Sequence, residues 1–157
     1  DAYSWRVGSL DRVRWETLPV MVVSTIIFSA ALYAFAGKLN VMYVGDKSAQ
    51  TLGENPTNIR IITLILASLL TAGLVSYTGT IGFIGLVGPH VARIFVGSNN
   101  RYLIPASAAF GAAFILAADT IAKVSGANGL PVGVISAMIG GPLFIWILIQ
   151  QRKNVWA

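Results

Sequence analysis

One stretch of 32 residues, from Ile61 to Ala92, contains no Asp, Glu, Lys or Arg. Glycine recurs at every third position near its end, at Gly79, Gly82, Gly85 and Gly88. A single bilayer crossing needs only about 20 apolar residues, so this stretch is long enough to enter a membrane, turn and return. Non-helical backbone at membrane depth is tolerated only where protein buries it or where it lines a wet cavity. The stretch therefore predicts part of a polytopic, pathway-forming membrane protein.

The composition supports a membrane protein and excludes several other classes. Of the 157 residues, 55% are hydrophobic and only 11% are charged, whereas soluble domains average about 25% charged residues. The net charge of +5 comes from Lys and Arg scattered between apolar runs, so we expect no nucleic-acid partner. Without cysteine and with one histidine, the chain cannot build a thiolate or catalytic zinc site, and we expect no metal and no cofactor.

The apolar runs predict an all-α transmembrane helix bundle with about five membrane elements. One is expected to be a short helix with Pro89 in its first turn, where a missing N–H costs nothing, after the glycine-rich segment re-enters the membrane irregularly. A long polar connection over residues 38–60 separates the first two spans. The chain begins with Asp and no signal-like region, so we interpret it as a piece of a longer protein. The expected spans are 18–36, 61–77, 86–95, 102–123 and 130–149.

The basic residues predict the orientation, because loops rich in Lys and Arg stay in the cytoplasm. Seven of them fall on the side of the long polar connection and four on the other, which predicts a cytoplasmic C-terminus. The first group is Lys38, Lys47, Arg60, Arg93, Arg101, Arg152 and Lys153, and the second is Arg6, Arg12, Arg14 and Lys123.

Small residues repeat every four positions on the last span, at Gly129, Gly133, Ala137 and Gly141. This spacing aligns them on one helical face and lets a neighbouring backbone approach closely. We expect packing within the chain, and a dimer interface with a second subunit is the alternative.

No constellation of residues points to an enzyme. Asp119 is a carboxylate inside an apolar run, but Lys123 stands four residues later on the same helical face, so an ion pair is expected. His90 is expected to be a hydrogen-bonded structural residue; a proton-coupled secondary transporter, the alternative function, would need His90 or Asp119 deep in the membrane. The segment Gly45-Asp46-Lys47-Ser48 lacks the glycine that precedes the lysine of a phosphate-binding loop. If ATP drives transport, another subunit must hydrolyse it.

Several motifs occur in order along nearly the whole chain. They are Gly79-Thr-Ile-Gly-Phe-Ile-Gly-Leu-Val-Gly-Pro-His-Val-Ala-Arg93, Asn100-Arg-Tyr-Leu-Ile-Pro105, Ala118-Asp-Thr-Ile-Ala-Lys123 and Leu130-Pro-Val-Gly-Val-Ile-Ser-Ala-Met-Ile-Gly-Gly-Pro-Leu-Phe144. Together they resemble the C-terminal half of the permease family of ABC importers for iron-siderophores, haem and cobalamin.

The resemblance implies a transmembrane subunit of the prokaryotic cytoplasmic membrane with ten helices, of which this chain would supply the last five. It also implies a second permease subunit, a separate ATPase subunit and a periplasmic or lipoprotein substrate-binding protein. The segment from Gly45 to Gly53 resembles the cytoplasmic coupling loop that meets the ATPase, so Ala49 and Leu52 are expected to meet a partner. The implied residues are Gly45, Asp46, Ala49, Leu52 and Gly53 for coupling, and Gly79, Gly82, Gly85, Gly88, Pro89, His90 and Arg93 for the pathway segment.

The resemblance further places Lys123 where family members carry a basic residue that docks the binding protein. Lysine lacks the bidentate geometry of the more usual arginine. The loop after it, Val124 to Gly129, also lacks the Glu often seen before the Leu-Pro pair. We therefore expect this face to be tuned to a different partner.

Overall fold

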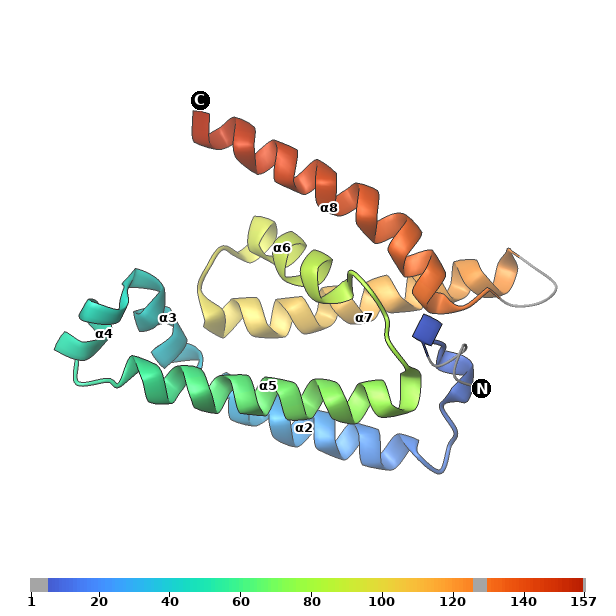
Figure 1. Cartoon of the computed structure of the whole chain (residues 1–157), viewed down its shortest axis with the longest axis horizontal. Coiled ribbons are helices and arrows are strands. Elements are labelled where there is room, and N and C mark those ends of the chain that lie inside the picture. Colours follow the sequence, from blue (N-terminus) through green and yellow to red (C-terminus); the bar gives the residue numbers. More distant parts are fainter. Residues whose placement is uncertain (1–5, 126–129, 157) are drawn as a thin grey trace.

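The computed structural model describes residues 6–125 and 130–156. This part of the chain consists of helices and their connections, which confirms the all-α prediction (Figure 1). The elements are the 3-10 helix η1 (Leu10–Arg12) and the α-helices α2 (Leu18–Ala34), α3 (Ala36–Val44), α4 (Asp46–Thr51), α5 (Pro56–Thr78), α6 (Ile84–Val96), α7 (Asn100–Val124) and α8 (Val132–Trp156).

Three of the described helices, α5, α7 and α8, are long and apolar enough to cross a membrane. The pair α2 and α3 passes the same test as one broken span, bent by 46°. Only 6% of the most apolar window of α5, and the same share for α7, is buried within the chain. Their apolar side chains therefore face outward, as expected for helices surrounded by lipid or by further protein.

The connection expected over residues 38–60 is mostly helical. Phe35 keeps a right-handed backbone and its carbonyl accepts the Leu39 N–H at 2.9 Å, so helical bonding resumes directly after the bend. Polar side chains such as Lys38 and Asn40 marked this segment as a connection, but lysine is a good helix former and the Asn40 side chain bonds Asn99 and Asn100 instead of its own helix. The true break comes at Gly45, whose φ of 138° is accessible mainly to glycine.

Helix α5 begins at Pro56, five residues before the apolar run that predicted it. Asn55 supplies the reason, because its side-chain oxygen accepts the N–H groups of Thr57 and Asn58 and caps the helix. Proline at the first helical position loses no bond there. Helices α2 and α5 lie side by side and run in opposite directions, so the start of α5 lies at the α3 end of α2 (Figure 1).

Helix α6 lies along α7, and the first turns of α8 pack against the last turns of α7 (Figure 1). A Cβ added to Gly88 would lie 3.6 Å from the Ser107 carbonyl oxygen, so α6 and α7 approach almost backbone to backbone. The buried cluster of Ala118, Ala122, Val132 and Ile135, with Leu10 against it, joins α7, α8 and η1.

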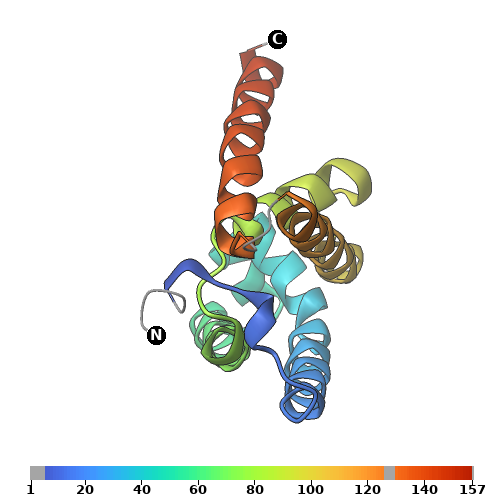
Figure 2. The ribbon, with the colours of Figure 1, turned by 90° about the vertical axis from the view of Figure 1, so that its right-hand side faces the viewer.

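The segment before η1 ties two helix ends together (Figure 2). The Ser9 N–H donates to the carbonyl of Thr78 at 2.8 Å, and the Gly133 N–H donates to the carbonyl of Gly8 at 3.2 Å. The Thr80 hydroxyl also donates to the Arg6 carbonyl. The end of α5 and the start of α8 are therefore held through residues 6–9.

Candidate coupling surface and membrane path

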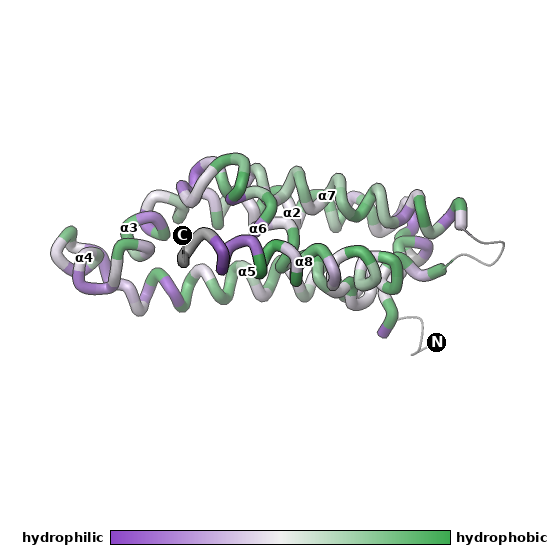
Figure 3. The backbone as a smooth tube through the Cα atoms, turned by 90° about the horizontal axis from the view of Figure 1, so that it is seen from above, coloured by the Kyte–Doolittle hydropathy of each residue, from purple (hydrophilic) through white to green (hydrophobic). Residues whose placement is uncertain are grey.

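The short helix α4 projects at one end of the molecule, beyond the ends of the long helices (Figure 1). Gly45 precedes it and Gly53 follows it, with φ values of 138° and 81°. Because these conformations suit glycine, the two residues let the chain turn sharply on both sides of α4. Hydropathy separates this polar end from the apolar long helices (Figure 3).

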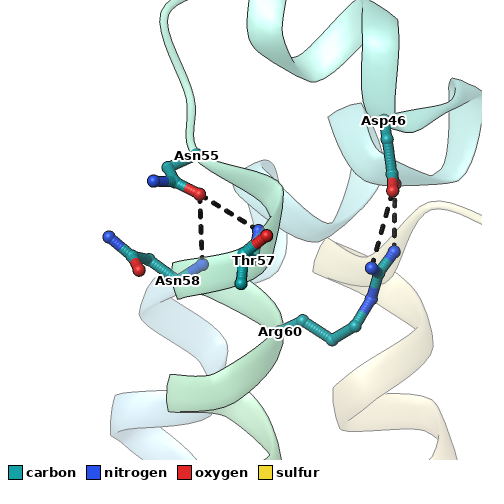
Figure 4. Close-up of polar contacts among 5 residues, drawn as sticks. All are labelled: Asp46, Asn55, Thr57, Asn58 and Arg60. Atoms are coloured by element: carbon teal, nitrogen blue, oxygen red, sulfur yellow. Dashed lines mark hydrogen bonds and ion pairs between the residues drawn. The ribbon is translucent and has the colours of Figure 1, made fainter.

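Side-chain contacts join α4 and its turn to the neighbouring helices. The Asp46 carboxylate pairs with the Arg60 guanidinium of α5 at 3.0 Å (Figure 4). Lys38 of α3 pairs with Glu54 at 3.3 Å. Exposed pairs of this kind contribute about 1 kcal/mol or less each, so they orient α4 more than they stabilise the fold. A helix held to both neighbours can transmit a displacement to α3 and α5 together.

The structure assigns different surroundings to the two apolar residues expected to meet a partner. Ala49 is fully buried within the chain, so its side chain is not available for contact, contrary to that expectation. Leu52 is 69% exposed, and Tyr43 and Val44, which precede Gly45, are more exposed still. These residues and the exposed Lys47 form a candidate coupling surface, which is called the coupling surface below and consists of Tyr43, Val44, Lys47 and Leu52. Tyr43 and Val44 were not singled out from the sequence, although two apolar residues beside Gly45 in a polar connection were a usable signal.

The pathway segment is irregular over residues 79–83 and helical from Ile84. Phe83 precedes the helix with a left-handed backbone, φ 66°, and its carbonyl accepts the N–H groups of Leu86 and Val87. The helix therefore starts earlier than expected, and Pro89 lies inside it instead of in its first turn. Without an N–H, Pro89 cannot bond the carbonyl of Gly85.

The four glycines of this segment serve different purposes. Gly79 ends α5 with φ 74°, and its N–H donates to the Val75 carbonyl at 2.8 Å. Gly82 and Gly85 have open space where a Cβ would lie. Gly88 packs against α7, while Arg93 of the same helix is exposed.

His90 joins α6 to α8. Its Nδ1 lies 2.6 Å from the Leu86 carbonyl oxygen, and its ring meets Phe144 edge-on with 5.5 Å between ring centroids. The hydrogen-bonded, packed ring is the arrangement expected of a structural histidine, and the role of His90 stays a prediction.

Asp119 and Lys123 form the ion pair that their spacing predicted, with 2.8 Å between carboxylate oxygen and ammonium nitrogen. The lysine side chain is much the more exposed of the two. Within residues 6–125 and 130–156, no group of three or more His, Asp or Glu side chains is arranged to hold a metal ion.

The four small residues of the last span do not form one packing seam. Gly133 packs against the backbone of Val7, and Ala137 lines a cavity beside it. Gly141 has open space where a Cβ would lie, whereas its neighbour Gly140 lies directly against Phe83. Gly129 lies outside the described residues. The four-residue spacing therefore missed the close approach at Gly140.

The family model of the FecCD transport family matches residues 1–150 of the chain. The chain belongs to the FecCD transport family. This confirms the family predicted from the motifs, and with the long apolar helices it makes the chain part of a multi-pass membrane protein.

Named relatives of this FecCD chain are permeases. It is 41% identical over 151 residues to the cobalamin import system permease protein of Halobacterium salinarum, covering 96% of this chain and 41% of the relative. It is 38% identical over 153 residues to the hemin transport system permease protein of Yersinia pestis, covering 96% and 45%. The chain thus spans less than half the length of these curated relatives.

A solved structure has the same fold. It is assigned to the metal-chelate type of ABC transporter, in an inward-facing conformation, and it matches with a TM-score of 0.88 at 31% sequence identity. The match covers 93% of this chain and 47% of the solved one.

Proposed function

We propose that this chain is part of the transmembrane permease subunit of an ATP-driven ABC importer for an iron chelate, haem or cobalamin. The observation that carries the proposal is the match to the FecCD family over residues 1–150, with cobalamin and hemin permeases among the relatives. In this role the chain carries out no chemistry. A separate ATPase subunit hydrolyses ATP, and a second permease subunit completes the path.

In the proposed mechanism the ATPase contacts the coupling surface and displaces α4. The ion pair between Asp46 and Arg60 carries the displacement to α5, and the pair between Lys38 and Glu54 carries it to α3. Packed helices with two discrete arrangements can then open the path to alternate sides. The irregular residues 79–83 and helix α6 are proposed to line that path, and Lys123 is proposed to meet the substrate-binding protein at the opposite end.

Capture of the ATPase tests this proposal. A complex containing this chain should retain an ABC ATPase subunit in detergent, and Leu52→Glu should weaken capture at least about tenfold, because a carboxylate replaces an apolar contact. Val124→Glu is the matched control. Val124 is 82% exposed, but it is the last residue of α7, whose end lies on the opposite side of the molecule from α4.

Either of two results would contradict the proposal. If the unmodified complex retains no ATPase, the ATP-driven importer is wrong. If Leu52→Glu and Val124→Glu retain it equally well, the coupling surface is misplaced although the importer stands.

The proposed orientation places α4 and the C-terminus in the cytoplasm and Lys123 in the periplasm. The chain has no cysteine, so single cysteines at Lys47 and Val124 would be its only thiols. A membrane-impermeant maleimide should label Val124→Cys in intact spheroplasts and Lys47→Cys only in inside-out vesicles. Labelling of both from one side would contradict the topology, and reversed labelling would invert it.

A further inference from the structure

A polar cavity of about 580 Å³ lies between α3, the turn before α5 and the start of α7. The 46° bend between α2 and α3 forms one side of it. Its lining residues are Tyr33, Ala34, Gly37, Lys38, Val41, Glu54 and Arg101.

The charges in the cavity favour an anion. Lys38 pairs with Glu54 at 3.3 Å, which leaves Arg101 as the excess positive charge. Within the described part of the chain, no carboxylate lies within ion-pair distance of Arg101. A Cβ on Gly37 would lie 3.6 Å from the guanidinium, so the Arg101 side chain reaches α3 at Gly37.

Hydrogen bonds hold the two basic walls in place. The Asn40 amide donates to the Asn99 side chain at 2.7 Å, and the Asn40 side-chain oxygen accepts the Asn100 N–H at 2.7 Å. Asn99 also caps α7 by accepting the Arg101 N–H. These contacts fix α3, which carries Lys38, against the first turn of α7, which carries Arg101. The spacing of the two backbone positions that carry Lys38 and Arg101 is therefore set by these contacts.

The cavity lies where apolar helices meet water. Helix α2 ends beside it, and α5 and α7 begin beside it, so three apolar segments share this boundary (Figure 1). Helix α3 forms one wall of the cavity, and the polar helix α4 follows α3 at this end of the molecule (Figure 3). Tyr33, half exposed on the cavity wall, suits the headgroup level, where tyrosine is enriched.

We propose that this cavity binds the phosphodiester of an anionic membrane phospholipid. The planar guanidinium of Arg101 matches two phosphate oxygens, whereas the charge of Lys38 is balanced by its ion pair with Glu54. Basic pockets between transmembrane helices attract anionic headgroups at the membrane surface. Ala34 and Val41 give the lipid glycerol region an apolar wall. The proposal needs only the membrane location of the chain and is independent of the substrate transported.

The test measures the lipid that remains with the purified complex containing this chain. After detergent washing, native mass spectrometry should detect bound phosphatidylglycerol, and Arg101→Gln should reduce its retention at least tenfold. Arg101→Lys, which keeps the charge without the planar fork, should give a smaller loss. Arg152→Gln, an exposed arginine on α8 outside the cavity, should leave retention unchanged. Unchanged elution and thermal midpoint of each variant show that the fold survives.

Three outcomes would overturn the proposal. Equal retention in Arg101→Gln and Arg152→Gln would show that the cavity does not hold the lipid. Displacement of the lipid by glycerol 3-phosphate at equal concentration would assign the cavity to a soluble phosphate. Loss of ATPase capture in Arg101→Gln with lipid retention unchanged would assign it to the partner protein.

Discussion

Replacing Gly133 by alanine is expected to lower the free energy of unfolding by about 2–3 kcal/mol, near the upper end of typical overpacking costs. The added Cβ would lie 1.6 Å from the Val7 carbonyl oxygen and 2.8 Å from its carbon. Both atoms belong to the backbone, so no side chain can rotate to make room. Residues 7 and 8 would have to move away, and the bond from the Gly133 N–H to the Gly8 carbonyl would be lost.

Gly141→Ala in the same helix is the matched control. A Cβ there has open space within 4 Å, and alanine improves helix propensity over glycine by up to about 1 kcal/mol. Thermal unfolding in detergent should therefore show a lower midpoint for Gly133→Ala and an unchanged or higher one for Gly141→Ala. Equal midpoints would show that residues 6–9 do not hold α5 and α8 together.

Features that depend on neighbouring residues in the sequence could be predicted. The apolar runs and their polar ends predicted an all-helical membrane fold, and the four-residue spacing predicted the contact between Asp119 and Lys123. The first follows from the length of the apolar runs, because an apolar run of about 20 residues crosses a bilayer as a helix, and the second because residues four apart lie on one helical face. The ordered motifs added the family, which the match over residues 1–150 confirms.

Features that depend on which segments meet in space could not be predicted. Ala49 and Leu52 are both small or apolar residues of one short segment, yet the first is fully buried and the second is largely exposed. Gly140 and Gly141 are adjacent in the sequence, and the residue outside the four-residue repeat is the one in contact. The early start of α6 likewise depends on the backbone of Phe83, which hydropathy does not report.

Alanine at Gly140 is expected to destabilise the contact between α8 and the start of α6 by about 1–3 kcal/mol. The new Cβ would lie 2.7 Å from the Cβ of Phe83 and 3.6 Å from a methyl carbon of Val87. Phe83 holds a left-handed backbone that costs a non-glycine residue about 1–3 kcal/mol and persists only where its surroundings enforce it. The missing side chain at Gly140 allows Phe83 to keep that conformation. Gly141→Ala again serves as the control in a thermal-unfolding measurement.

A double mutant identifies the contact responsible. Phe83→Gly removes the clashing Cβ and accepts the positive φ without strain, so Gly140→Ala should cost at least about 0.5 kcal/mol less in that background. Additive effects would show that the strain of Gly140→Ala is relieved elsewhere, for instance against Val87. Non-additive effects of the two substitutions would identify the contact between Phe83 and Gly140 as the one that fixes where the irregular segment ends and α6 begins. Any displacement of α6 relative to α8 in the proposed transport cycle would then have to rearrange this contact, because Phe83 and Gly140 touch with no side chain between them.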